Sequence, residues 1–216
     1  RDSKAVVLFV QMLGCPIVRQ SYPYLEEMRT KYASQGVTFL YVNSNPWETL
    51  ESVAAECKEY SVTSPVLRDP HRALAHALGF RRSAESIVID PKTWKIVYRG
   101  MADDRFDYGL QRMSPGKFWL HDTLEAMMTG KTPAVAPTIA KGCLLDLDFT
   151  VKPEYGKDVA PILVSKFPGH FGGHPDENAA RMLAQTAAGA LLTGRSAGRE
   201  ISFSDAEAET LVAWLF

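Results

Sequence analysis

The sequence predicts an α/β fold, a mixed central sheet with helices on both faces, followed by a small all-α part at the C-terminal end. Two short apolar runs, residues 5–12 and 37–42, have the composition of strands that are buried on both sides. Segments with helical spacing of apolar residues follow both runs, so strands and helices alternate. Beyond residue 153 the pattern contains helical segments alone. With 216 residues and 46% hydrophobic content, the chain can bury a full core.

The first half of the chain gives five elements in order. The strand at 5–12 is followed by a helix over 17–33, which Gly36 ends. The second strand, 37–42, leads into the turn at 43–46, which has the composition of a helix start. The helix expected next has its apolar residues on one face. Cys57 lies on that face, so the pattern predicts that it is a core residue. This helix is expected over residues 47–60, and a short extended piece is expected after it, at residues 65–67.

Four more elements complete the predicted sheet domain. A small helix over 72–78 ends at Gly79, and the turn at 91–94 joins two strands into a hairpin, 86–90 and 96–99. A last helix over 117–128 is closed by Gly130. The order of elements predicts helices on both sides of a mixed sheet.

The remaining chain predicts a linker and a second domain. Residues 132–137 are rich in proline and mark the linker, and three short helical segments follow. The last of these opens with a capping box made by Ser204 and Glu207. We therefore expect a domain over 1–131, a linker over 132–152 and a helical domain over 153–216. The three helices are expected at 157–164, 176–192 and 204–215.

Composition excludes several classes of function. The formal charge of −1 gives no electrostatic footprint for nucleic acid or for an anionic membrane surface. The longest apolar runs are far shorter than the roughly 20 residues of a membrane span, so no direct span is predicted. Three cysteines give no paired disulfide framework. Because residue 1 leads straight into the first strand, we expect that the chain begins inside a longer polypeptide, whose N-terminus would be the place of any membrane anchor.

One cysteine stands between the first buried strand and the helix that follows. Gly14 allows the turn, and Pro16 suits the first turn of a helix, where its missing N–H would be unpaired in any case. Cys15 is thereby placed at a helix N-terminus, where free N–H groups stabilise a thiolate and lower the pKa of the thiol. Cys15 is the candidate nucleophile of the chain. No His or Lys close to it in sequence supplies a base.

Several segments together resemble the redoxin branch of the thioredoxin-like superfamily, which includes peroxiredoxins and periplasmic thiol–disulfide proteins. The matching segments are residues 8–17 (LFVQMLGCPI), 36–45 (GVTFLYVNSN), 65–70 (PVLRDP), 98–105 (YRGMADDR) and 141–144 (KGCL). The end of the chain looks like a c-type cytochrome module, from YGKDVAPIL at 155–163 to FSDAEAETLVAW at 203–214. The resemblance implies a thioredoxin-like fold and an exported, periplasm-facing protein.

The chain departs from these families at the positions that carry their chemistry. Val18 stands where thioredoxins have the second cysteine of C-x-x-C, so local dithiol exchange is absent. Met12 and Leu8 replace the threonine and proline that shape the peroxide pocket of peroxiredoxins. Ala84 replaces the cis-proline of the superfamily, and a cis bond before alanine would cost about 2.5–4 kcal/mol. We therefore expect a trans peptide and a lost docking surface for substrate thiols.

The second module also lacks its motif. Covalent haem needs C-x-x-C-H, but residues 167–171 read FPGHF and no cysteine follows Cys143. Covalent haem is excluded, and we expect no cofactor.

Cys143 is the plausible partner of Cys15, because the resemblance places it after the last helix of the domain. A structural disulfide, two separate thiols and a redox-cycling pair are all open at this point.

The remaining candidates have simpler interpretations. His170 and His174 could face one metal, but two glycines between them favour a solvated loop, and we expect no metal site. His71 and His76 have poor spacing for shared ligation. Asp103 and Asp104 beside Arg105 indicate a salt-bridged turn rather than acid–base catalysis. Aromatic residues in the later half of the domain could include a partner surface: Trp94, Phe106, Tyr108, Phe118 and Trp119.

Three hypotheses of function follow from this pattern. The first is a non-catalytic accessory or scaffolding subunit of a membrane electron-transfer complex, respiratory or photosynthetic, whose partners are protein subunits. The second is a thiol oxidoreductase or peroxidase in which Cys15 is oxidised and Cys143 or an external thiol reduces it. The third is a metal or copper chaperone that uses Cys15 with a distant His or Met.

Overall fold

The computed structural model describes residues 3–107, 110–149, 152–167, 180, 195–196 and 199–216. They form two compact units. The first contains Arg1–Pro70 and Phe80–Asp146, and the second contains His71–Gly79 and Leu147–Phe216. The second unit therefore takes a short piece from the middle of the predicted first domain.

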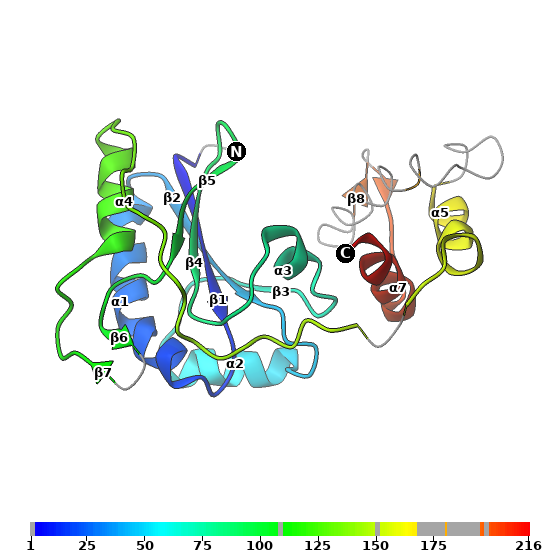
Figure 1. The fold of residues 1–216 in the computed structure, drawn as a ribbon, viewed down its shortest axis with the longest axis horizontal. Coiled ribbons are helices and arrows are strands. Elements are labelled where there is room, and N and C mark those ends of the chain that lie inside the picture. Colours follow the sequence, from blue (N-terminus) through cyan, green and yellow to red (C-terminus); the bar gives the residue numbers. More distant parts are fainter. Residues whose placement is uncertain (1–2, 108–109, 150–151, 168–179, 181–194, 197–198) are drawn as a thin grey trace. The chain divides into compact units, whose positions relative to one another are not determined.

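A mixed sheet of five described strands forms the centre of the first unit, in the order β3-β2-β1-β4-β5 (Figure 1). The central strand β1, Ala5–Gln11, runs parallel to β2, Val37–Asn43, with Ala5 opposite Val37. On its other side β1 is antiparallel to β4, with Val7 opposite Val88. The outer strands are β3 (Val66–Arg68) beside β2, and β5 (Lys95–Gly100) beside β4 (Ser86–Asp90). The predicted α/β fold and its mixed sheet are confirmed.

Two helices of this unit lie side by side (Figure 1). They are α1, Pro16–Ala33, and α4, Trp119–Met128, which Tyr32 joins through a hydrogen bond from its hydroxyl to Glu125 Oε2 at 2.9 Å. Val18, Leu120 and Leu124 are fully buried in one core with the strands. A two-stranded ribbon, β6 (Phe106–Asp107) with β7 (Leu110–Gln111), stands apart from this sheet.

Helix α2, Leu50–Glu59, corrects the predicted apolar stripe. Its cap is Thr49, whose side chain accepts from the N–H of Ser52. Leu50 is 66% exposed, and Cys57 is only partly buried, whereas Val53 and Glu56 face inward. The prediction of Cys57 as a core residue on this stripe was wrong, because the carboxylate of Glu56 is buried by hydrogen bonds that hydropathy cannot register.

The segment after α4 returns along the first unit. Within the predicted linker 132–152, the N–H of Thr138 donates to the carbonyl of Arg99 at 3.1 Å, and Thr138 Oγ1 accepts from the N–H of Met101 at 2.8 Å. A Cβ at Gly100 would lie 2.1 Å from Thr138 Oγ1, so the two backbones approach closely here. The chain up to Asp146 belongs to the first unit, and the predicted linker is therefore docked over most of its length.

The second unit is helical in its longer described segments. It contains α3 (Ala73–Leu78), a π-helical turn (Tyr155–Val159), α5 (Ala160–Lys166), the ribbon β8 (Arg195–Ser196) with β9 (Arg199–Glu200), and α7 (Asp205–Leu215). Leu163, Leu211 and Trp214 share a small core. The predicted capping box is confirmed, since Ser204 and Glu207 each accept from the backbone N–H of the other. The predicted helix 176–192 lies outside the described residues apart from Ala180, which is helical and buried.

Throughout the described ranges, no helix has the length and apolar content that crossing a membrane requires.

A carboxylate on α1 fastens the chain between α2 and β3. Glu26 accepts hydrogen bonds from four residues: Arg29, Tyr41, Thr63 and Ser64. Burial alone would raise the pKa of Glu26, but the hydrogen bonds outweigh it and lower the pKa from its ordinary value of 4.5 to about 2. The charged carboxylate therefore stabilises the folded state.

This depressed pKa predicts an acid-dependent loss of stability. The contribution of Glu26 is fully present above pH 4.5 and is lost as the pH falls through about 2. In Glu26→Gln, unfolding free energy measured by denaturant titration should depend less steeply on pH in that window. Glu27→Gln is the control, because Glu27 is the exposed neighbour on the same helix. Equal pH profiles for Glu26→Gln and the unmodified protein would contradict the assignment.

Candidate functional site

The loop that carries Cys15 is held by two carboxylates. The backbone N–H of Leu13 donates to both oxygens of Glu48, at 3.1 and 3.2 Å, and the N–H of Gly14 donates to Glu56 Oε2 at 3.0 Å. Gly14 has a φ of +71°, which the turn requires and which favours glycine. Cys15 then occupies the N-cap position of α1. The predicted placement of Cys15 at a helix N-terminus is confirmed.

Glu56 is itself fixed by its neighbours on α1. Arg19 Nη2 lies 2.6 Å from Glu56 Oε2, and the hydroxyl of Tyr22 donates to Glu56 Oε1 at 3.2 Å. Tyr22 in turn accepts from Gln11 Nε2 at 2.9 Å. A polar network below the Cys15 loop thus sets the position of that loop relative to α1 and α2.

Ser83 lies between the two predicted site cysteines. Its hydroxyl donates to Cys15 Sγ at 3.2 Å and accepts from the backbone N–H of Cys143 at 2.9 Å. The side chain is fully buried. Ser83 precedes Ala84, whose N–H donates to the carbonyl of Val10 at 2.8 Å and which has a φ of +60°, in the left-handed region that strains alanine. No peptide bond of the described residues is cis, so the trans bond expected at Ala84 is confirmed.

Residues 141–145, which we call the strap, bring Cys143 to this place. The strap lies beside residues 81–83, where Arg82 and Leu144 form an antiparallel bridge. The N–H of Ser83 donates to the carbonyl of Cys143 at 2.9 Å, and the N–H of Leu145 donates to that of Arg81 at 3.1 Å. The strap is therefore a short antiparallel partner of the loop that precedes β4.

Gly142 sets how closely the strap approaches. A Cβ on Gly142 would lie 2.1 Å from the carbonyl oxygen of Ser83 and 2.5 Å from its hydroxyl oxygen. Real Cβ atoms do not come this close to backbone, so the position excludes any side chain. Arg82 Nη1 also donates to the carbonyl of Gly142 at 3.0 Å.

The two thiols differ in exposure and in acidity. All three cysteines are free thiols; Cys15 is 2% exposed and Cys143 is exposed. Burial alone would raise the pKa of the Cys15 thiol, but the Ser83 hydroxyl, the nearby N–H groups of Val18 and Cys143, and the Cys143 thiol together lower it. Burial and the neighbouring Cys15 raise the pKa of Cys143. Ser83 thus joins a buried cysteine whose thiol pKa is lowered to an exposed cysteine whose thiol pKa is raised.

Removal of the Ser83 hydroxyl should therefore change the acidity of Cys15. We expect Ser83→Ala to raise the pKa of the Cys15 thiol, because the strongest of its stabilising hydrogen bonds is lost. The pH dependence of thiolate absorbance, measured with Cys57 replaced by alanine, would report the shift. Ser34→Ala, at the exposed end of α1, is the control. An unchanged or lower pKa in Ser83→Ala would rule out this role of the hydroxyl.

The other predicted candidates take structural positions. Val18 is fully buried in the core, where it offers no second thiol. The salt-bridged turn is confirmed, since Arg105 Nη2 lies 2.8 Å from Asp103 Oδ2 and Asp104 accepts from the N–H groups of Gly116 and Lys117.

The histidines of the described chain have partners of their own. His71 Nε2 lies 3.5 Å from Asp205 Oδ1, and His76 Nε2 lies 3.0 Å from the carbonyl oxygen of Leu147. His170 and His174 lie outside the described residues. Within the residues that are described, no three His, Cys, Asp or Glu side chains gather as a metal site would require.

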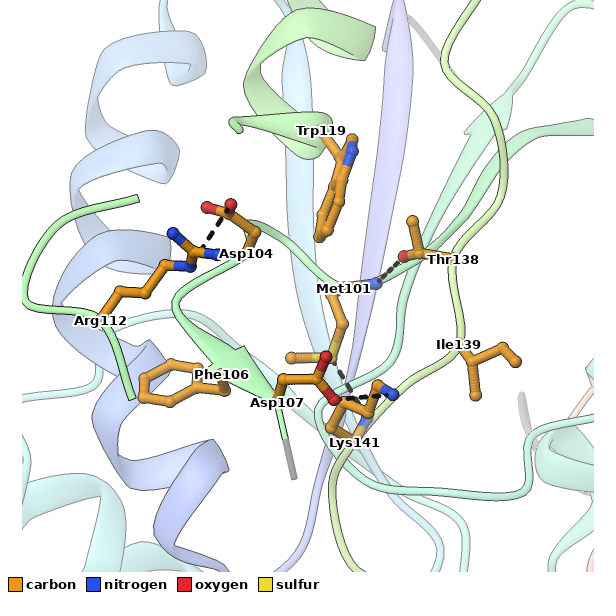
Figure 2. A pocket seen from close by; sticks show the side chains of 9 residues that line it. All are labelled: Met101, Asp104, Phe106, Asp107, Arg112, Trp119, Thr138, Ile139 and Lys141. Carbon is orange, nitrogen blue, oxygen red and sulfur yellow. Dashed lines mark hydrogen bonds and ion pairs between the residues drawn. The ribbon is translucent and has the colours of Figure 1, made fainter. Parts of the chain in front are cut away.

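A cavity of about 260 Å³ opens beside the start of the strap, and Figure 2 shows its lining. Its charged groups pair with one another: Lys141 Nζ lies 2.9 Å from Asp107 Oδ1, and Arg112 Nε lies 3.8 Å from Asp104 Oδ2. The N–H of Lys141 also points to the sulfur of Met101 at 3.3 Å. The ion pair between Lys141 and Asp107 ties the start of the strap to strand β6.

Comparison with known proteins places the fold. Residues 1–107 match the family model described as Redoxin. A hypothetical protein from Sinorhizobium meliloti has 29% sequence identity, with a TM-score of 0.59 over 68% of this chain and 81% of that one. An uncharacterised conserved protein from Geobacillus kaustophilus has 23% identity and the same TM-score, over 69% and 80%. No curated protein sequence matches this chain. The family match does not extend to residues 153–216, so their resemblance to a cytochrome stays a prediction.

Proposed function

Residues 1–107 form a redoxin domain of thioredoxin-like fold, and from that premise we propose that the protein performs thiol–disulfide exchange through Cys15 and Cys143. The observation that carries the proposal is that one buried hydroxyl, that of Ser83, contacts both the sulfur of Cys15 and the backbone N–H of Cys143. The second thiol of the ordinary motif is absent, and Val18 takes its place. The strap supplies a thiol from the other end of the unit instead.

The proposed step is the reversible oxidation of two thiols to one disulfide. The Cys143 thiolate attacks an external disulfide, forms a mixed disulfide and releases one external thiolate. The Cys15 thiolate then attacks the Cys143 sulfur and expels the second external thiolate, and both released thiolates take protons from water. A thiolate at Cys15 needs no separate base, because the hydrogen bonds around it already lower the pKa of the thiol. An external disulfide is the oxidant, and it is reduced to two thiols.

The test is a redox titration of the full chain in glutathione buffers, followed by alkylation and intact mass measurement. We expect two thiols to disappear together, with peptide mapping giving a Cys15–Cys143 disulfide. Cys57→Ala should behave in the same way, because Cys57 contacts neither site cysteine. Cys15→Ser and Cys143→Ser should form no intramolecular bond. Independent oxidation of the two cysteines would overturn the proposal.

A second candidate is the accessory role in an exported membrane electron-transfer complex. It is favoured by one observation: Cys15 is buried, which leaves little of that thiol open to a large substrate. Purification from gently solubilised membranes tests it. Fixed stoichiometry with pigment-bearing or haem-bearing subunits would support this role, and recovery of the protein alone would contradict it.

A further inference from the structure

We infer that external thiols exchange at the sulfur of Cys143, with Cys15 as the internal leaving group, so that the pair acts as an oxidant of thiols. The inference rests on the proposed disulfide between these residues. It assigns the exposed strap cysteine, rather than the helix cysteine, as the sulfur that meets the substrate. The substrate class is a thiol, which is oxidised to a disulfide.

Access is the first argument. Thiol–disulfide exchange requires the attacking thiolate to reach one of the two sulfurs of the bond. Cys15 is 2% exposed, whereas Cys143 and the following Leu144 are exposed. The Cys143 side of the bond is therefore the side that an external thiol can reach.

The leaving group is the second argument. When the bond to Cys143 breaks, the electron pair goes to the sulfur of Cys15. The Ser83 hydroxyl donates to that sulfur, and the sulfur stands at the N-terminus of the 18-residue helix α1. A thiol of lower pKa leaves faster, and stabilisation of the reduced form makes the corresponding disulfide a stronger oxidant.

Charge near the entry point is the third argument. Arg82 lies on the adjoining strand of the bridge, where its positive charge acts on Cys143 and opposes the rise in the pKa of that thiol. An approaching thiolate is an anion and is attracted by the same guanidinium. Arg82 therefore favours attack by an external thiolate at the sulfur of Cys143 over attack at a sulfur that has no cation beside it.

The oxidation of external thiols proceeds in two exchanges. A first external thiolate attacks Cys143, forming a mixed disulfide and releasing the Cys15 thiolate. A second external thiolate attacks the external sulfur of that mixed disulfide, forming an external disulfide. Cys143 leaves as a thiolate and takes a proton from water. Two external thiols are oxidised, and one protein disulfide is reduced to two thiols.

The experiment uses the oxidised full chain with Cys57→Ala, so that two cysteines remain. Reduced glutathione is added, the reaction is quenched with acid at short times, and the glutathione adduct is located by peptide mass spectrometry. We expect the adduct at Cys143 in at least about tenfold excess over Cys15. The same reaction in denaturant is the control, where the excess should disappear because the fold no longer hides Cys15.

The outcomes separate this inference from the proposal beneath it. An adduct at Cys15 in the folded protein, or equal adducts at the two sulfurs, overturns the inference and leaves the disulfide pair intact. Failure of the Cys15–Cys143 disulfide to form overturns both. A cysteine-containing peptide in place of glutathione should attack the same sulfur, since access and leaving group are unchanged.

Discussion

Replacement of Gly142 by alanine is expected to weaken formation of the Cys15–Cys143 disulfide by about 5- to 150-fold. The added Cβ would lie 2.1 Å from the carbonyl oxygen of Ser83, so the strap must move away from the loop. Overpacking of this kind costs about 1–3 kcal/mol, and each 1.4 kcal/mol is a factor of ten in an equilibrium constant. Because the substitution alters neither thiol, it tests the position of Cys143 without changing the chemistry of that residue.

The measurement is the glutathione-dependent equilibrium between dithiol and disulfide, compared with that of the unmodified protein. Gly116→Ala is the matched control in the same unit, because a Cβ there would make only an ordinary contact with Asp104 at 3.5 Å. A Gly142→Ala protein that forms the disulfide as readily as the Gly116→Ala protein would show that the strap does not govern the pair.

Glu56→Ala should destabilise the folded protein by about 2–5 kcal/mol. It leaves the fully buried hydroxyl of Tyr22 without its acceptor, which costs about 1–3 kcal/mol, and it removes the charge-assisted hydrogen bonds that Gly14 and Arg19 donate to the carboxylate. The Cys15 loop loses one of its two carboxylate anchors at the same time. Denaturant unfolding, followed by tyrosine and tryptophan fluorescence, measures the free energy of unfolding.

Glu59 supplies the control for this substitution. It lies on the same helix α2 and is exposed, so Glu59→Ala should change the free energy of unfolding by less than about 0.5 kcal/mol. Glu56→Gln should fall between the two, because the amide oxygen can still accept while the charge facing Arg19 is removed. Equal stabilities for Glu56→Ala and Glu59→Ala would show that the network is dispensable.

Much of the fold was predictable because its signals are local. The apolar runs gave β1 and β2, glycines marked the ends of helices, and the capping box at Ser204 is a pattern of adjacent residues. The stripe on α2 failed for a reason that hydropathy cannot show. Glu56 is buried by partners on α1 and on the Cys15 loop, which lie more than 30 residues away in sequence.

The site was predictable only in part, because it is assembled from distant pieces. Helix and turn signals placed Cys15, and resemblance singled out Cys143, but no sequence pattern measures their separation. Ser83 carried no signal beyond its place before Ala84, although it contacts both cysteines. Gly142 carried no sequence signal either. The close approach to Ser83 that requires a glycine there exists only after the strap has docked.

The membership of α3 has a consequence for how the protein can be divided. This six-residue helix lies in sequence within the redoxin match, yet it packs in the second unit, where Arg72 Nη2 lies 2.8 Å from Glu209 Oε1 and the ring of His76 stacks on Phe149 and Phe216. So short a helix is not stable alone in water. A shortened gene product ending at Asp146 would keep α3 without its partners. The two units should therefore be expressed and engineered as one polypeptide.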